Sequence, residues 1–354
     1  MSGAPWTDRG KETSLRRFFL APLASLYAAG AGLNRKAFAA GVREQRKLSC
    51  QVLSVGNIVV GGSGKTPTVA WLANQLAARG VSVAVASRGY GRKSDESVVV
   101  VSDGRKICAE LDKAGDEPSL LARHCPGVPI LVGPDRFDLG LCAIEKFGTE
   151  LLLLDDGFQH MRLLRDLDLI TFDGNFGLGN GHVLPRGPLR ESLSALEDVQ
   201  AFLVLDGPMD EEEIRTLRKF APGASWFAAR RIMKRVRSLK DGAVESAESL
   251  SGRQVGLVAG LANPGNFRRC VEQLGVEVVA ERYFPDHHPY REKDLAGLES
   301  QASLWLTTEK DAVKILPEWQ ASKCLRAVDL ELEVSDAVEF LDWLLIRLRV
   351  NYLG

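Results

Sequence analysis

The chain has 354 residues, which is enough for two domains. Hydrophobic residues make up 45% and charged residues 26%, as in soluble globular proteins, and the net charge of −1 argues against binding to nucleic acid or another polyanion. The six cysteines are scattered without a Cys-x-x-Cys pair, which argues against a disulfide framework or a zinc site and favours reduced thiols in the cytosol.

An apolar run near the N-terminus, Phe18 to Leu33, lies between two basic pairs, Arg16-Arg17 and Arg35-Lys36. The run contains Pro22 and is shorter than the about 20 residues that a membrane-spanning helix needs. Basic flanks on both sides favour a helix that lies in the membrane interface. A helix that covers the domain core and a true membrane span are the alternatives. A signal peptide is disfavoured because no cleavage site stands out beyond the alanines.

The most informative stretch is the glycine-rich segment Gly61-Gly62-Ser63-Gly64-Lys65-Thr66, between a predicted strand at 51–56 and a predicted helix at 66–78. Backbone N–H groups of such a loop, together with the positive end of the helix dipole, bind phosphate. Lys65 would reach the β- and γ-phosphates of a nucleotide, and Thr66 would offer its hydroxyl to Mg²⁺. Val59 replaces the first glycine of the usual motif, so the turn is expected to differ in shape. An ordinary glycine-rich turn is the alternative.

Later predicted strands, at 81–86, 128–132 and 150–155, deliver polar residues to the sheet edge where α/β proteins bind ligands. Arg88 follows the first strand, in a loop that either meets a phosphate or is simply solvated. Arg136 opens the helix after the second. The third strand, four leucines long, ends in Asp155 and Asp156, which are expected to bind Mg²⁺ or its water.

The segment Gly-Asp-Glu-Pro at 115–118 predicts a helix start with two readings. Asp116 either caps the helix, or it faces the γ-phosphate together with Glu117. The spacing alone does not separate these two roles.

The second half of the chain begins with a predicted strand at 167–172 and a long loop at 175–191, in which Arg190 and Glu191 are candidates for substrate contact. Strands and helices then alternate as in a smaller α/β domain. The loop Asp286-His287-His288 has no third ligand at usable spacing, so a proton-handling histidine is a better hypothesis than a metal site. The segment at 305–311 lacks the Asn-Lys-x-Asp order of guanine readers, so GTP is not favoured.

Taken together, the motifs resemble those of the tetraacyldisaccharide 4′-kinase family, the lipid A 4′-kinases. They run in order from about residue 50 to 315: Val-Gly-Asn-Ile-Val-Val-Gly-Gly-Ser-Gly-Lys-Thr-Pro (55–67), Ser-Arg-Gly-Tyr-Gly (87–91), Gly-Asp-Glu-Pro (115–118), Asp-Asp-Gly-Phe-Gln-His (155–160), Leu-Pro-Arg-Gly-Pro-Leu-Arg-Glu (184–191), Ala-Asn-Pro (262–264), Phe-Pro-Asp-His-His (284–288) and Thr-Glu-Lys-Asp-Ala-Val-Lys (308–314). Each motif alone is a weak signal, but the ordered set is specific. Arg186 departs from the small residue often found at its position.

The resemblance, with the strand and helix pattern, implies an α/β fold with a P-loop NTPase-like, mostly parallel sheet, a second, smaller α/β domain and an N-terminal membrane-associated helix. The expected divisions are a membrane-contacting segment at 1–48, a nucleotide-binding domain at 49–170 and a substrate or lid domain at 175–330. A two-stranded hinge is expected near 170 and 330. The last helix, within 335–354, is expected to pack back on the nucleotide-binding domain.

The activity implied by the resemblance is transfer of the γ-phosphate of ATP, with Mg²⁺, to the 4′-hydroxyl of a tetraacylated glucosamine disaccharide 1-phosphate. The enzyme would act peripherally at the cytoplasmic face of the bacterial inner membrane, without an obligate protein partner. The family's residues fall on this chain by role: catalytic Asp116, His287 and Lys65; nucleotide-binding Gly61, Gly62, Ser63, Gly64, Lys65 and Thr66; metal-binding Thr66, Glu117, Asp155 and Asp156; substrate-binding Arg88, Arg136, Arg190 and Glu191.

Two other functions fit the phosphate loop. A soluble P-loop kinase of another small metabolite would explain the loop and the aspartate pair but not the apolar N-terminal run. A non-catalytic P-loop switch, which hydrolyses nucleotide to change partners, would need no base to deprotonate an acceptor. Asp116 and His287 would then be dispensable.

Overall fold

The computed structural model describes residues 14–261, 264–286 and 288–350. The chain forms two compact units: unit 1 extends to Arg230 and resumes at Val334, and unit 2 comprises Arg231–Glu333. The predicted boundary and hinge near residues 170–175 are therefore wrong. The strand at 167–173 does not leave the first unit, because the next strand, at 201–205, pairs with it in parallel. The second boundary lies close to the expected residue 330.

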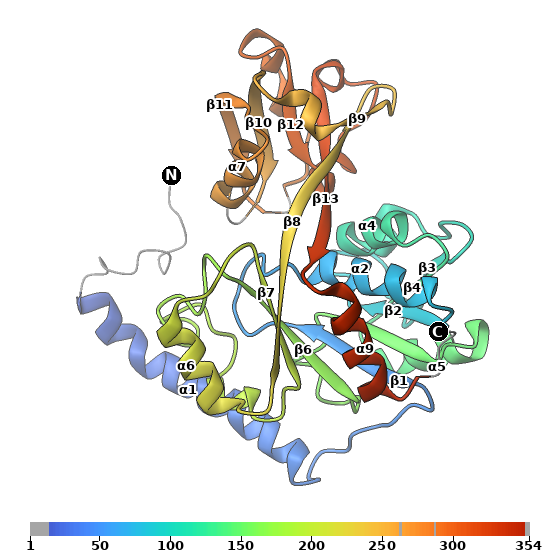
Figure 1. The fold of residues 1–354 in the computed structure, drawn as a ribbon, viewed down its shortest axis with the longest axis vertical. Helices are drawn as coiled ribbons and strands as arrows, with labels where there is room; N and C mark the ends of the chain where they lie inside the picture. The colour runs from blue at the N-terminus through green and yellow to red at the C-terminus, as the bar shows by residue number, and fades with distance from the viewer. Residues whose placement is uncertain (1–13, 262–263, 287, 351–354) are drawn as a thin grey trace. The chain divides into compact units, whose positions relative to one another are not determined.

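Unit 1 is built on a mostly parallel sheet with the strand order β8-β7-β6-β1-β5-β2-β4-β3 (Figure 1). Only the β3–β4 pair in this order is antiparallel. The strands are β1 (Gln51–Gly56), β2 (Val83–Ser87), β3 (Val99–Asp103), β4 (Pro129–Val132), β5 (Leu151–Asp155), β6 (Leu167–Asp173), β7 (Ala201–Leu205) and β8 (Ser225–Ser238), the last of which continues into unit 2. The mostly parallel α/β architecture confirms the predicted fold class.

The helices of unit 1 are α1 (Ser14–Ala39), α2 (Lys65–Ala78), α3 (Leu111–Ala114), α4 (Asp116–His124), α5 (Arg136–Phe147), the 3₁₀ turn η1 (Leu193–Leu196), α6 (Glu211–Phe220) and α9 (Ala337–Leu348). The closing helix α9 belongs to this unit (Figure 1). The Phe340 ring stacks on Trp71 of α2, and its centroid lies 4.4 Å from that of the Phe227 ring in β8.

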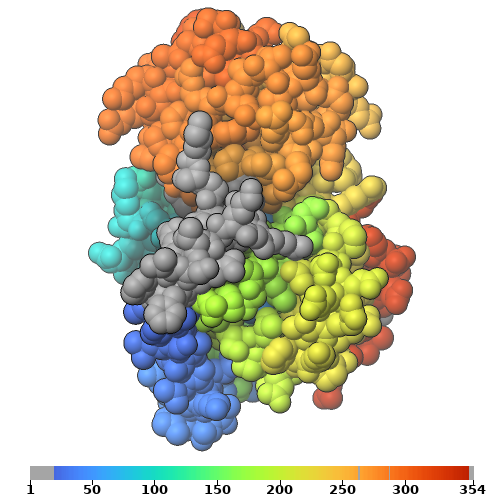
Figure 2. Space-filling model, turned by 90° about the vertical axis from the view of Figure 1, so that its left-hand side faces the viewer, coloured from blue at the N-terminus to red at the C-terminus, as the bar shows by residue number. Residues whose placement is uncertain are grey.

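Helix α1 lies at the surface of unit 1, where its blue atoms face the viewer in Figure 2. Ala24 and Phe38 are buried, whereas the side chains of Leu23, Leu26 and Leu33 are between 56% and 73% exposed. The exposed leucines recur at helical spacing and form an apolar stripe. Within residues 14–261, 264–286 and 288–350, no helix combines the length and apolar character needed to span a bilayer.

The central strands β1 and β5 position the site, because both are buried and their carboxyl ends lie side by side. Leu151 to Leu154 have no exposed surface, as expected for a strand covered on both faces of a parallel sheet. Val55 of β1 pairs with Asp155 of β5, so the glycine loop and the aspartates start from neighbouring positions. A Cβ on Gly56 would lie 2.5 Å from Cβ of Phe158, so glycine lets the aspartate segment pack directly against β1.

Unit 2 contains four parallel strands in the order β11-β10-β12-β13, and β9 pairs antiparallel with the final residues of β8. Its elements are β9 (Val244–Ser246), η2 (Ala247–Leu250), β10 (Gln254–Gly260), α7 (Pro264–Glu272), β11 (Glu277–Phe284), η3 (Glu292–Leu295), η4 (Leu298–Ser300), β12 (Trp305–Thr308), α8 (Glu309–Ala312), η5 (Gln320–Lys323) and β13 (Leu325–Val334). The carboxyl ends of β10, β11 and β12 therefore lie at one edge.

Candidate active site

The glycine loop joins β1 to α2 in a conformation that only glycine adopts easily. Gly61 and Gly64 have φ angles of 123° and 79°, and Gly64 is the N-cap residue of α2. Ser63 is buried, and its hydroxyl lies 2.6 Å from Asn57 Nδ2, which donates to it, and 3.1 Å from Thr171 Oγ1. The loop is thus braced at Ser63, while Gly61 and its neighbour Gly62 are exposed and Thr66 is half-buried.

The two aspartates after β5 occupy different environments. Asp155 is 2% exposed; its Oδ2 accepts a hydrogen bond from Ser87 Oγ at 3.3 Å, and its buried Oδ1 has no hydrogen-bond partner among the described residues. Asp156 has a φ of 54°, and both of its oxygens accept from Arg190 Nη1, at 2.9 and 3.0 Å. Lys65 Nζ lies 3.7 Å from the same Asp156 carboxylate.

These environments separate the two acids electrostatically. Burial, followed by the charges of Glu117 and Asp156, raises the pKa of Asp155 to about 7. Burial acts in the same direction on Asp156, but Lys65 and Arg190 outweigh it and hold its pKa below the ordinary value. Asp156 is therefore an ionised, paired acid near neutral pH, whereas Asp155 loses its proton only around neutral pH.

The segment at 115–118 starts α4, but Asp116 does not cap it. Gly115 is the N-cap residue, so the capping reading is wrong, and Asp116 is the first helical residue. Glu117, one residue later, contributes to the field at Asp155. His287 lies outside the described residues. The structure therefore brings Glu117, Asp155, Asp156 and Lys65 together within unit 1, and says nothing of His287.

The three arginines predicted to bind substrate lie in different surroundings. Arg88 is exposed, and Arg136 is 4% exposed, with Nη1 donating to Pro134 O at 3.2 Å. Burial and the nearby charge of Arg88 lower the pKa of Arg136. Arg190 pairs with Asp156. The arginines predicted to bind substrate therefore come from three segments: Arg88 and Arg190 from two loops, and Arg136 from the start of α5.

Glu191 connects the site to α1. Its Oε2 accepts hydrogen bonds from Arg35 Nε at 3.1 Å and Nη2 at 2.9 Å. The Arg35 guanidinium also lies 4.7 Å from the centroid of the Phe158 ring, two residues after Asp156. The sequence analysis treated Arg35 only as a basic flank of the apolar run; no local signal identified its buried partner.

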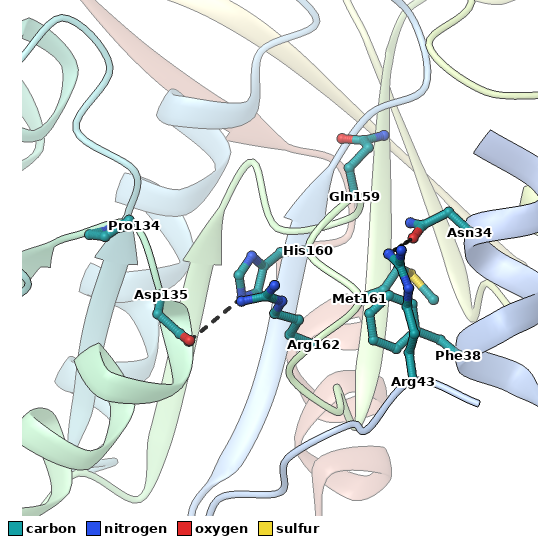
Figure 3. Close-up of a pocket in the computed structure, with 9 residues that line it drawn as sticks. All are labelled: Asn34, Phe38, Arg43, Pro134, Asp135, Gln159, His160, Met161 and Arg162. Atoms are coloured by element: carbon teal, nitrogen blue, oxygen red, sulfur yellow. Dashed lines mark hydrogen bonds and ion pairs between the residues drawn. The ribbon is translucent and has the colours of Figure 1, made fainter. Parts of the chain in front are cut away.

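A cavity of about 450 Å³ opens beside this contact, between the end of α1 and the start of α5 (Figure 3). His160 and Asp135 face each other on one side, with 3.9 Å between Nε2 and Oδ1, and Asn34 accepts a hydrogen bond from Arg43 on the other. Burial, and then the charge of Arg136, lower the pKa of His160 to about 4, so its ring is neutral at physiological pH. The lining residues are Asn34, Phe38, Arg43, Pro134, Asp135, Gln159, His160, Met161 and Arg162.

Comparison with known proteins decides the family. The sequence matches the family described as Tetraacyldisaccharide-1-P 4′-kinase over residues 16–349. The chain belongs to this family. The resemblance inferred from the motifs is confirmed, and membership makes the chain a kinase, a phosphotransferase with a P-loop.

Individual relatives agree with the family over nearly the whole chain. A tetraacyldisaccharide 4′-kinase of Anaeromyxobacter sp. (strain Fw109-5) is 41% identical over 326 residues, covering 89% of this chain and 88% of that protein. One from Syntrophus aciditrophicus (strain SB) is 35% identical and covers 95% of both chains. The crystal structure of LpxK from Aquifex aeolicus in complex with ATP superposes with a TM-score of 0.76 at 32% identity, covering 94% of this chain and 99% of that one.

The Asp155→Asn substitution should stabilise the nucleotide-free protein at high pH. Because the folded-state pKa of Asp155, about 7, exceeds the ordinary carboxyl value, the folded protein binds more protons than the unfolded chain between these values. Stability attributable to this group is therefore lost as pH rises through that window. Asp155→Asn does not titrate, so in EDTA its melting temperature should exceed that of the parent by a few degrees at pH 8, and the difference should shrink toward pH 5.

Differential scanning calorimetry measures both values, and the exposed Asp95→Asn is the matched control, for which no pH-dependent gain is expected. An Asp155→Asn protein less stable than the parent at pH 8 would mean that neighbouring cations, rather than burial, dominate at Asp155.

Proposed function

We propose that this kinase transfers the γ-phosphate of ATP, with Mg²⁺, to the 4′-hydroxyl of a tetraacylated glucosamine disaccharide 1-phosphate, a step of lipid A biosynthesis. The reaction takes place at the cytoplasmic face of the bacterial inner membrane. The observation that carries the proposal is the convergence of Lys65 with the Asp155–Asp156 pair, 3.7 Å from Lys65 Nζ to Asp156. The same segment continues to Gln159 and His160, which line a polar cavity bordered by α1. The proposed acceptor is taken from the relatives, which are named as tetraacyldisaccharide 4′-kinases.

The nucleotide would bind at the glycine loop. Amides of Gly61 to Thr66 and the N-terminus of α2 provide fixed dipoles for the phosphates, and Lys65 supplies a positive charge. Phosphoryl transfer depends mainly on positioning and on neutralising charge in the transition state. ATP in the related Aquifex aeolicus crystal structure supports this assignment.

Mg²⁺ fits the residues beside this loop. Asp155 Oδ1 is buried without a hydrogen-bond partner in the described parts of the chain, and such an atom needs a cation or donor. Mg²⁺ commonly takes one or two carboxylates and completes its shell with water and phosphate oxygens, so a buried acid beside a phosphate-binding loop suits it. Thr66, Glu117, Asp155 and Asp156 are the proposed ligands or water holders, and Mg²⁺ would neutralise the β- and γ-phosphates.

The disaccharide head would occupy the cavity between α1 and α5, whose lining residue Asp135 directly precedes Arg136. Arg88, Arg190 and Glu191 are the other proposed substrate contacts. The cavity offers hydrogen-bonding side chains, including Asn34 and Gln159, and two arginines, Arg43 and Arg162, suited to sugar hydroxyls and a phosphate. The acyl chains would follow the apolar stripe of α1, which begins at the same border.

The acceptor hydroxyl must lose a proton as its bond to phosphorus forms. We assign this task to Asp116, at the start of α4, with His287 as its orienting partner, as the family resemblance implies. A carboxylate assisted by an imidazole can operate near neutral pH, where an alcohol alone is a weak nucleophile.

Incubation of the purified protein with labelled ATP, Mg²⁺ and a tetraacylated disaccharide 1-phosphate should yield a bisphosphorylated lipid. Lys65→Ala should lower transfer at least about 100-fold, because its charge counters one that grows in the transition state. The exposed Lys47→Ala is the control with an equal change of charge. Equal transfer to a non-acylated sugar would favour the small-metabolite kinase, and normal turnover of folded Lys65→Ala would remove the phosphate-loop assignment.

Peripheral membrane association should depend on the α1 stripe. Leu26→Glu should weaken cosedimentation with vesicles containing anionic phospholipid, because it places a charge where an apolar side chain meets the membrane interface. Ile346→Glu on α9 is the matched control, since Leu26 and Ile346 are 73% and 72% exposed. Equal binding by the parent and both variants would argue against α1 as the contact.

Asp116→Ala, His287→Ala and the double variant should reveal whether the two residues act together. For a single catalytic unit, the double variant should lose little more kcat than the worse single variant, while the KM for ATP stays within about 2-fold. The parent pH–rate profile should show an ionisation near neutrality that is absent in His287→Ala. Additive losses in kcat would contradict the pairing, and a phosphate-loop switch predicts no loss at all.

A further inference from the structure

The segment 188–191 runs beside the residues that lead into the glycine loop of unit 1. Arg190 N donates a hydrogen bond to Ile58 O at 2.7 Å. Val60 N donates to Pro188 O at 2.8 Å. The backbone of this segment is therefore fixed beside the glycine loop up to position 190, and the charged side chains at 190 and 191 start from there.

These two side chains have different partners. Arg190 Nη1 donates to both oxygens of Asp156, and the same carboxylate lies 3.7 Å from Lys65 Nζ. Glu191 is 8% exposed, and its Oε2 accepts hydrogen bonds from Nε and Nη2 of Arg35. Its buried Oε1 has no hydrogen-bond partner in the described parts of the chain. A carboxylate buried to this degree is stable only beside a cation, and Arg35 supplies one.

A rigid ring gives the Arg35 guanidinium a defined position. Phe158, two residues after Asp156, is 1% exposed, and the guanidinium lies 4.7 Å from the centroid of its ring. The aromatic ring and the Glu191 carboxylate thus restrict the same side chain of α1. Arg35 can therefore transmit the position of the Phe158 segment to the end of the segment 188–191.

Exposure distinguishes Arg35 from its neighbour in the basic pair that ends the apolar run. Lys36 is exposed, as expected for a charge that meets anionic lipid. The Arg35 side chain is 22% exposed and contacts Glu191 and Phe158. The two residues therefore differ in role, although the sequence places them side by side.

We propose that Arg35 is a positioning residue for phosphoryl transfer, which through Glu191 holds Arg190 against Asp156. The inference rests on the proposed function, in which Asp156 binds Mg²⁺ or its water and Arg190 contacts substrate. Reaction rates are sensitive to small displacements of such groups, so the loss of a contact outside the site can lower kcat. Helix α1, the proposed lipid contact, is in this way joined to the phosphate-transfer end of the site.

Kinetics and melting temperatures of Arg35→Met, alone and combined with Glu191→Met, test the proposal. Arg35→Met should lower kcat about 10-fold or more. It should also lower the melting temperature, because it leaves Glu191 buried without its cation. The double variant replaces both charges by apolar side chains of similar length, so its melting temperature should largely recover while its kcat stays low. If Arg35→Met folds poorly, the double variant alone carries the test.

A second cycle asks whether Arg35 acts through Arg190. In the Arg190→Met background, Arg35→Met should lower kcat by no more than about 2-fold, since the group that it aligns is gone. Arg79→Met is the matched control. Arg79 is also half-buried, but its guanidinium donates to Gln75, four residues earlier in the same helix, and kcat should equal that of the parent.

Three outcomes would overturn the proposal: normal kcat in Arg35→Met, recovery of kcat together with the melting temperature in the double variant, or an undiminished loss in the Arg190→Met background. The second of these would show that the contact serves only stability. A parent protein inactive on the lipid would instead contradict the proposed function.

Discussion

The ion pairs of Asp156 with Lys65 and Arg190 connect the three segments on which the site depends. They join the glycine loop, the end of β5 and the long loop after β6, at a place where burial would otherwise disfavour a negative charge. At Asp155, the adjacent acid, burial outweighs the charge of Lys65, and one buried oxygen has no hydrogen-bond partner in the described residues. The two adjacent carboxylates therefore differ in how far neighbouring charges offset the effect of burial on their pKa values.

The same region is connected to the surface helix. Arg35 of α1 contacts both Glu191 and the ring of Phe158, so the helix with the exposed leucine stripe is bound to the two segments that flank Asp156. Two nitrogens of Arg35 donate to the same oxygen of Glu191, and a planar guanidinium held in this way is better oriented than a solvated lysine would be. The exposed leucine stripe of α1 and the polar cavity lined by Asn34 and Phe38 of the same helix thereby belong to one unit.

Unit 2 also has a buried acid at the carboxyl ends of its strands, but the contacts of this acid differ from those in unit 1. There Asp311 accepts hydrogen bonds at the carboxyl edge of β10 and β12, and burial, the largest influence, raises its pKa. Its neighbour Lys310 pairs outward with Asp286. In unit 1 the two residues at the end of the strand are acids in different environments, whereas in unit 2 a lysine and a buried acid follow the strand.

The sequence by itself determined the elements whose signals are local: the β1–glycine loop–α2 unit, the leucine strand that ends in Asp155 and Asp156, and the alternation that predicts an α/β fold. Glycine, Lys-Thr and apolar runs act over a few residues, and the ordered motifs were sufficient for the family. Only the tertiary structure decided the boundary at Arg230, the Gly115 cap before Asp116, the Arg35–Glu191 contact and the different environments of the two aspartates. The boundary, the arginine contact and the two aspartate environments depend on strand pairing, burial or ion pairs between residues far apart in the chain, and such contacts leave no periodic trace in the sequence. Gly115 caps α4 where its backbone packs against Tyr90, since an added Cβ would lie 2.8 Å from Tyr90 O, and this contact too is formed only in the fold.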